Sequence, residues 1–379
     1  MEVAASTTEK IEEEEGEKEM TNYKVTVKKK KKKKSKKCNK PDKVQSTEKL
    51  LKQAQLHIDR FEYEEAARCL KKILCCEPNN LEALDSLAGL FIETRDFDQA
   101  HNLLLKIIEL RPDGGYGSYF TLAQISEGEE SLHYYKRGIQ ILERLLCDEG
   151  QSTEVKNHES LRKDLTEAYC SIAEIYMTDL CDDDNAEEQC RFHINKSLEC
   201  GPEFPEGHQC LASFLLILQK KEESKEAVTK SLSFWLPRYR AAREGQTENS
   251  DDEPFLVNYD FRINTCKILI ELEMYDEASE ILDGLIEEND SVLETWYLLG
   301  LLNYSRGEAY WENARYYFKK ALKLKEIGVP HDPEQISQVE SCLTEMGPGS
   351  DGEEDENEEN EAVDDNVDFP SDLEEEMES

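Results

Sequence analysis

The sequence predicts an all-α fold, a right-handed superhelical solenoid of about seven helix pairs with disordered charged termini. The first indication is a repeat, because similar residues recur 34 positions apart, as in Ala66 and Ala100 or Leu70 and Leu104. The second is composition: the middle is rich in Leu, Ile, Tyr and Phe, whereas both ends are charge blocks that can bury little apolar surface. The third is that no apolar run approaches the ~18 residues of a membrane span, so we expect no membrane partner.

A 34-residue period is typical of the tetratricopeptide repeat, in which W-x2-L-G-x2-Y is followed by A-x3-F and then by P. The last repeat follows this pattern most closely, with Trp296, Leu299, Gly300, Ala314 and Phe318 in the expected positions. Looser copies fill the rest of the middle of the chain. Small residues let the two helices of a pair approach closely, and the pairs bury a continuous core only by stacking on one another.

The repeat pattern divides the chain into three regions. We predict a disordered N-terminal tail over 1–46, the repeat solenoid over 47–346 and a disordered acidic tail over 347–379. Two insertions interrupt the period, one near 146–164 and one near 238–254. The second is rich in acidic and polar residues, so we expect it to be a disordered loop.

One further helix is predicted to close the end of the solenoid. Ile336, Val339, Leu343 and Met346 follow one another at helical spacing, which indicates an amphipathic helix. A repeat array needs such a capping element because its last pair would otherwise expose the apolar face that every other pair buries.

The charge is strongly negative. The chain has 84 acidic against 46 basic residues and a formal net charge of −38. The acidity belongs to the body as well as to the C-terminal tail, where residues 351–379 hold sixteen acids and no base. Stable binding of nucleic acid needs a basic surface that neutralises phosphates, so we do not expect it. The natural partner of such a surface is a basic one.

The sequence lacks the patterns of known catalytic and metal sites. Twelve cysteines include no C-x-x-C pair, and no cluster has the short spacing of a zinc site. No G-x-S-x-G, H-E-x-x-H or phosphate-binding glycine loop occurs. The first residues are acidic rather than basic and then apolar, so no signal peptide is expected. We therefore predict a protein that is not an enzyme and that needs no metal or cofactor.

A lysine run near the N-terminus is the one basic block. Its nine lysines within ten residues are Lys28, Lys29, Lys30, Lys31, Lys32, Lys33, Lys34, Lys36 and Lys37. We interpret this run as a nuclear localisation signal, which predicts an import receptor as a partner and a location in both nucleus and cytoplasm. Two alternatives stay open: transient contact with RNA phosphates, and a solvated run that pairs with the acidic tail.

Carboxylates on the first helix of each pair are the candidate binding residues, because in this repeat that helix lines the concave surface. Acidic residues occupy the second position of that helix in Glu48, Glu82, Glu167, Glu206, Asp260 and Glu294. An alternative explanation is that acids in a first helical turn complement the helix dipole. Four carboxylates lie deeper along the same helices, where the dipole explains them less easily: Asp85, Glu93, Glu174 and Glu271.

These residues together carry a resemblance. The segments 47–110, 169–180 and 368–378, joined by the repeat pattern and the acidic tail, resemble the dedicated assembly chaperones of the fourth protein of the large ribosomal subunit. The resemblance implies a non-catalytic protein that binds its newly made basic client and shields the long internal loop that enters ribosomal RNA. It also implies delivery of the client to the nuclear precursor of the large subunit. The lysine run has no place in the family pattern.

Two other functions remain open from the sequence. Acidic repeat proteins of the nucleus also handle histones, so an acidic histone chaperone is one alternative. The other is a non-catalytic scaffold that joins the subunits of a complex, since solenoids mainly present surfaces.

Overall fold

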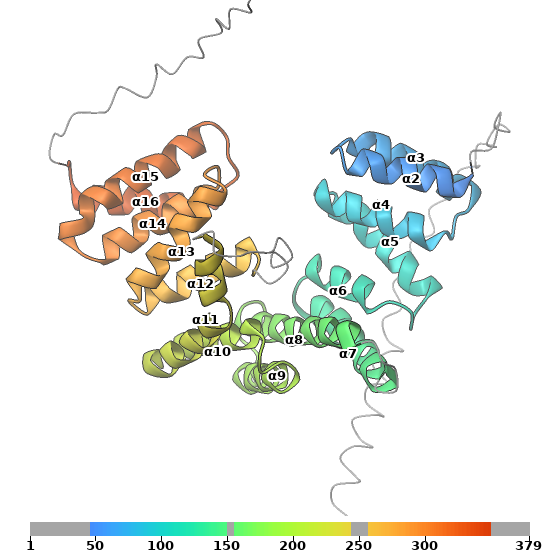
Figure 1. The fold of residues 1–379 in the computed structure, drawn as a ribbon, viewed down its shortest axis with the longest axis horizontal. Helices are drawn as coiled ribbons and strands as arrows, with labels where there is room; N and C mark the ends of the chain where they lie inside the picture. The colour runs from blue at the N-terminus through green and yellow to red at the C-terminus, as the bar shows by residue number, and fades with distance from the viewer. Residues whose placement is uncertain (1–45, 150–154, 244–256, 350–379) are drawn as a thin grey trace, which may run out of the picture. The chain divides into compact units, whose positions relative to one another are not determined.

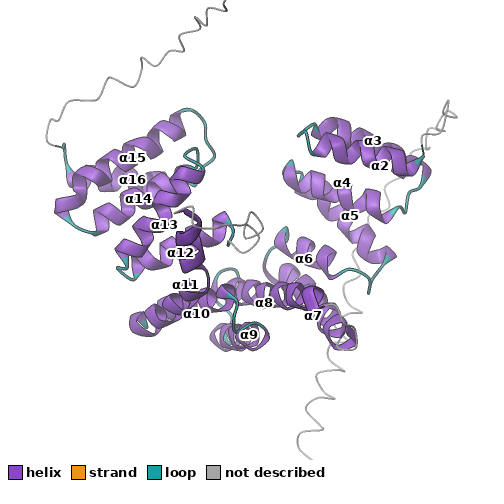
Figure 2. Ribbon diagram, in the orientation of Figure 1, coloured by secondary structure: helices purple, strands orange, loops and turns teal. Residues whose placement is uncertain are grey.

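The computed structural model describes residues 46–149, 155–243 and 257–349, and these residues are helical with no strand among them (Figure 2). Seven consecutive helix pairs run through them (Figure 1). The pairs are α2 (Thr47–Ile58) with α3 (Tyr63–Cys76), α4 (Leu81–Glu93) with α5 (Phe97–Leu110), α6 (Tyr116–Gln124) with α7 (Gly128–Glu149), α8 (Val155–Met177) with α9 (Ala186–Cys200), α10 (Pro205–Ile217) with α11 (Lys221–Arg243), α12 (Tyr259–Glu271) with α13 (Tyr275–Glu288), and α14 (Leu293–Ser305) with α15 (Trp311–Glu326). The predicted all-helical repeat fold is confirmed.

The chain forms two compact units. One reaches Leu90 and the other starts at Phe91, so the division falls within α4. In the second unit, α10 packs against both α8 and α12, and α14 packs against α12. From α8 to α14, the first helices of successive pairs are therefore neighbours. No helix of the described residues is both long and apolar enough to cross a membrane.

Small residues of the repeat pattern lie at buried positions of the second helices. Ala66, Ala100, Ala278 and Ala314, which follow the repeat pattern, are all completely buried. At Gly300, an added Cβ would overlap the ring of Phe318. The glycine is therefore required by the close approach of α14 and α15, as the repeat pattern predicts.

Three pairs place a serine or a cysteine where the repeat prefers alanine. Ser224 is buried on α11, and its hydroxyl donates a hydrogen bond of 2.8 Å to the carbonyl of Ala212 on α10. Ser131 does the same to the carbonyl of Ala123 at 2.7 Å. The Cys190 thiol donates to a carbonyl of α8 in the same way, at the longer distance usual for sulfur. A small polar side chain thus fits the tight helix contact because it finds a partner there.

In four of the seven pairs, the turn between the two helices contains a non-glycine residue with positive φ. Phe61, Arg95, Gln219 and Glu273 all have φ between 57° and 61°, and each lies two residues before a second helix. A left-handed conformation in a non-glycine residue costs roughly 1–2 kcal/mol, so packing of the pair must hold these turns. The sequence does not reveal the turns because none of the four residues is glycine.

The predicted capping helix is present as α16 (Pro333–Met346). Asp332 precedes it and accepts a hydrogen bond from the backbone N–H of Glu334, which caps its start. Ile336, Val339 and Met346 are buried, and α16 packs against α14 and α15. The end of the last pair is therefore covered.

Helix occupies the parts of the predicted insertions that the structure describes. Residues 146–149 end α7, residues 155–164 begin α8, and residues 238–243 end α11. The first insertion therefore extends two helices, and α8 begins eleven residues before position 166, where the repeat pattern places its start. The loop predicted beyond residue 243 falls outside the described residues up to position 256, as do the lysine run and the acidic tail.

Candidate functional site

One exposed stripe of charge runs along α8. Lys163, Glu167 and Glu174 are exposed and lie four and seven residues apart, which places them on one face of the helix. Glu167 lies in the middle of α8 rather than in its first turn. The helix dipole, which acts within the first turn, cannot explain this carboxylate. The prediction that it occupies the second position of its helix is wrong, because α8 already begins at Val155, within the insertion that precedes it.

A second stripe runs along α12. Asp260, Lys267 and Glu271 are exposed and share one face, since seven and eleven residues are close to two and three whole turns. Asp260 lies in the first turn, where it complements the helix dipole. Glu271 is the last residue of the helix, at the end where a negative charge is disfavoured. The dipole therefore accounts for Asp260 but not for Glu271.

Lysines on these stripes pair with carboxylates of the next first helix. Lys163 on α8 lies 3.5 Å from a carboxylate oxygen of Glu206 on α10 and 3.8 Å from one of Glu167. Lys267 on α12 lies 2.7 Å from Glu294 on α14. Glu206 and Glu294 are thus partly neutralised from within the protein. They join neighbouring repeats, which makes them weaker candidates for contact with a partner.

Glu174 and Glu271 differ from these paired carboxylates. Within the described part of the chain, neither side chain forms an ion pair or a hydrogen bond. The pKa of the exposed Glu174 is nevertheless raised by burial, because protein atoms surround the stripe on which it lies. An incoming cation would relieve this unfavourable desolvation. Both residues therefore stay the better candidates for binding a basic partner.

The negative charges of Glu167 and Glu206 lie close together in an unfavourable arrangement. Burial, followed by the nearby charge of Glu206, raises the pKa of Glu167 above its ordinary value. Glu206 is only 14% exposed, and one of its carboxylate oxygens is buried with no hydrogen-bond partner in the described structure. Among the described residues, Lys163 is the cation that forms ion pairs with these two acids. The region between α8 and α10 thus has an excess of negative charge.

The remaining candidates lie on α2 and α4. Glu48 forms an i,i+4 ion pair of 2.8 Å with Lys52, so it is satisfied locally. Glu82 and Asp85 are exposed one turn apart on α4, in the first unit. Glu93 is exposed and is the last residue of α4. The described residues offer no ion-pair partner to any of these three α4 carboxylates.

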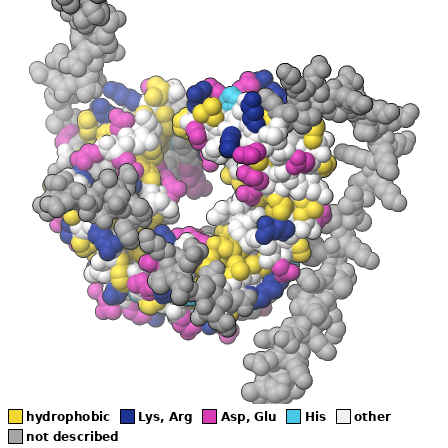
Figure 3. Space-filling model, turned by 45° about the vertical axis from the view of Figure 1, so that its right-hand side comes forward, with side chains coloured by type: hydrophobic (Ala, Val, Ile, Leu, Met, Phe, Trp, Pro, Cys, Tyr) yellow, Lys and Arg dark blue, Asp and Glu magenta, His cyan; other side chains and the backbone are white. Residues whose placement is uncertain are grey.

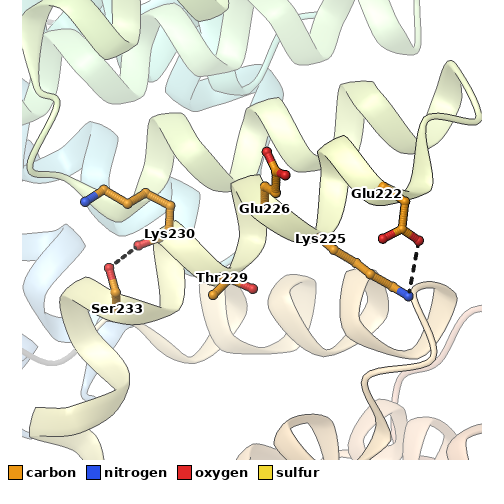
Figure 4. A pocket seen from close by; sticks show the side chains of 6 residues that line it. All are labelled: Glu222, Lys225, Glu226, Thr229, Lys230 and Ser233. Carbon is orange, nitrogen blue, oxygen red and sulfur yellow. Dashed lines mark hydrogen bonds and ion pairs between the residues drawn. The ribbon is translucent and has the colours of Figure 1, made fainter.

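One pocket among the described residues lies on a second helix. Figure 4 shows a shallow depression along α11, lined by side chains of that helix alone, in which Lys225 pairs with Glu222. No group of His, Cys, Asp or Glu among the described residues could hold a metal ion. On the face drawn in Figure 3, acidic and basic side chains are interspersed with apolar ones. On this face, the acidic groups do not form an unbroken negative patch.

The sequence interpretation considered only the acidic members of these stripes and missed Lys163 and Lys267. Their positions carried a usable signal, since each lies four or seven residues from an acid on the same first helix. The pairing partner on the next helix has no such signal. It depends on which turns of α8 and α10, or of α12 and α14, meet in space.

Known proteins similar to this chain share its repeats. No protein-family model matches it. The "Probable assembly chaperone of rpl4" of Schizosaccharomyces pombe is 35% identical over 259 residues, which are 63% of this chain and 72% of that protein. The chain belongs to the family of assembly chaperones of rpl4. A second member of this chaperone family, from Emericella nidulans, is 25% identical over 266 residues, 66% of this chain and 63% of that protein.

A solved structure of this chaperone family has the same fold. The structure of "Assembly Chaperone of RpL4 (Acl4) (Residues 1-338)" aligns with a TM-score of 0.58 at 27% identity, and it covers 71% of this chain and 99% of that one. The resemblance predicted from the sequence is thereby confirmed at the level of the family and of the fold. The residues proposed above to contact a partner stay a prediction.

Proposed function

We propose that this protein is a dedicated, non-catalytic chaperone of newly made rpl4, the fourth protein of the large ribosomal subunit. Its family membership carries the proposal, since the relatives that it resembles over most of their length are named for that client. The net charge of −38 supports it, because a protein that inserts into ribosomal RNA must itself carry basic segments.

In this proposal, the first helices bind the basic loop of rpl4 and keep it away from other polyanions. Glu174 and Glu271 supply the direct contacts because no cation of the described residues pairs with them. Glu206 and Glu294, held by Lys163 and Lys267, contribute mainly to the field of the surface. Long-range attraction speeds the encounter and weakens with salt, since the Debye length is only about 8 Å at physiological ionic strength.

Delivery to the nucleus and release complete the proposed cycle. The run Lys28–Lys37 would be read by an import receptor. At the precursor of the large subunit, ribosomal RNA presents a much denser array of negative charge than the chaperone does. The RNA can therefore displace the chaperone from the basic loop without ATP or covalent chemistry.

Affinity purification of the tagged protein from cytosol, followed by mass spectrometry, tests the proposal. We expect rpl4 in roughly equal amount to the chaperone and no other ribosomal protein at that level. Recovery of histone pairs without rpl4 would show the acidic histone chaperone instead. Recovery of a fixed multi-subunit set would show a scaffold, and either result contradicts the proposal.

The import signal needs its own test. Replacing the lysines of the Lys28–Lys37 run by glutamine should leave rpl4 binding intact and reduce accumulation of the chaperone in the nucleus. A matched control replaces exposed lysines of the body, such as Lys72 and Lys136, by the same residue. Unchanged nuclear accumulation of the run variant would mean that the signal lies elsewhere, for example on the client.

A further inference from the structure

The last second helix, α15, has a basic exposed face that the proposed function does not use. Lys319 and Lys323 are exposed on it, and Lys320 is half-buried beside them with its ammonium 5.5 Å from the ring centre of Tyr316. Exposed apolar side chains flank the lysines, with Tyr316 53% and Ile327 76% exposed. A cluster of this kind is unusual in a body with a large excess of acids.

The helix dipole accounts for only part of this face. Lys323 lies in the last turn of α15, where a cation is favoured. Lys319 lies a full turn earlier, beyond the reach of that effect. Lys325 is already paired with Glu340 of α16 at 3.3 Å. By contrast, Lys319 and Lys323 form no ion pair with any residue that the structure describes.

The chain leaves the described structure right beside this helix. The guanidinium of Arg315 on α15 donates hydrogen bonds to the carbonyls of Met346 at 2.6 Å and Gly347 at 3.2 Å. Gly349, the last residue described, lies against the side chains of Glu312 and Arg315. Gly349, two residues before the acidic segment 351–379, is thereby held at the first turns of α15.

The length and charge of the adjoining chain indicate which segment could bind the lysine face of α15. From Arg315 to Lys323 the helix rises by about 12 Å, which about four extended residues can span. The adjoining segment 351–361 has eleven residues, of which eight are acidic and none is basic. A short tether gives such a segment a high effective concentration at the helix, so that weak individual pairs suffice to hold it.

We propose that the acidic segment 351–361 docks on the basic face of α15 in the same molecule. The docked segment covers Lys319, Lys320 and Lys323 and so keeps foreign polyanions such as RNA from this face. The acids of residues 364–378 remain available to the client. The N-terminal run Lys28–Lys37 is the competing intramolecular partner of the acidic segment, and cross-linking distinguishes the two arrangements.

Zero-length carbodiimide cross-linking of the full chain, which joins lysine amines to carboxylates in contact, tests the docking. We expect peptides linking Lys319 or Lys323 to residues 351–361 at least five-fold more often than peptides linking that segment to Lys72 or Lys136. These links should disappear in 0.5 M NaCl, because exposed ion pairs are screened. Equal linking to all lysines, or linking of the segment only to the Lys28–Lys37 run, overturns the proposal.

A charge-reversal variant gives a second readout. Lys319→Glu/Lys323→Glu should expose the acidic segment and speed its cleavage by a glutamate-specific protease several-fold. Lys72→Glu/Lys136→Glu, which makes the same charge change elsewhere, should not. A cleavage rate unchanged by the first variant contradicts docking. Protection of Lys319 and Lys323 by added single-stranded RNA, with no link to the segment, would identify this face as a nucleic-acid surface instead.

Discussion

Replacing Glu174 by glutamine should weaken the binding of rpl4 without destabilising the fold. Two opposite charges 4 Å apart attract by about 4 kcal/mol at an effective dielectric constant of 20. Desolvation and lost side-chain freedom offset most of this, and pairs that stay fully exposed retain only 0.2–1 kcal/mol. Glu174 is exposed yet partly desolvated. We therefore expect a loss of about 1–2 kcal/mol, which is about a 5- to 30-fold increase in Kd.

The same Glu174→Gln variant should be at least as stable as the wild type. Burial raises the pKa of Glu174, so the folded protein takes up this proton more readily than the unfolded chain does. The contribution of Glu174 to the free energy of unfolding therefore decreases as pH rises through the raised pKa, and it is unfavourable at pH 7. Glutamine cannot ionise, so the variant should unfold at the same or a higher temperature at pH 7 and lose this part of the pH dependence.

Calorimetric titration with the basic loop of rpl4 measures the affinity, and thermal unfolding measures the stability. Glu226→Gln is the matched control, because Glu226 is exposed on the outer helix α11 and the exchange changes the charge equally. It should change Kd less than about two-fold at 0.15 M salt. Equal losses of affinity in both variants would show that only net charge matters. A lower unfolding temperature for Glu174→Gln would show a structural role, and either result refutes the reasoning.

Three further predictions concern the packing and pairing of the repeats. Ser224→Ala should lower the free energy of unfolding by about 1 kcal/mol in urea, because it removes one buried hydrogen bond; an unchanged value would contradict this. Gly300→Val should lower the free energy of unfolding by about 1–3 kcal/mol, because the added side chain overpacks against Phe318. Thermal unfolding should show a lower melting temperature, and a melting temperature equal to that of the wild type would mean that the ring can move. The double variant Lys267→Gln/Glu294→Gln keeps the net charge, so its Kd for the client should stay within about three-fold; a larger loss would make the pair part of the binding surface.

The repeat pattern predicts much of this fold because it encodes burial directly. Each alanine or glycine at the helix contact marks where a second helix must approach, and Gly300 opposite Phe318 shows the steric reason. Helix starts next to Glu82, Glu206 and Glu294 follow from the same register. The start of α8 does not follow, because the residues inserted before Glu167 continue the helix instead of forming a loop.

The candidate site is less predictable. Periodicity along one helix places Glu174 and Glu271 on exposed faces, and the structure agrees. Position along the helix separates them from Glu206 and Glu294, which lie in first turns, but it cannot show that they also differ in pairing. The difference is a lysine on the neighbouring helix.

By itself, the sequence determined the all-helical repeat class, the register of most helix pairs, the capping helix and the excess of negative charge. These properties depend on composition and on spacing along one chain. Only the tertiary structure decided which carboxylates are neutralised, which turns adopt positive φ without glycine, and that Gly349, close to the acidic C-terminal segment in the sequence, lies against the first turns of α15. Each of these depends on which residues of different helices meet through space, and no period along the sequence records that.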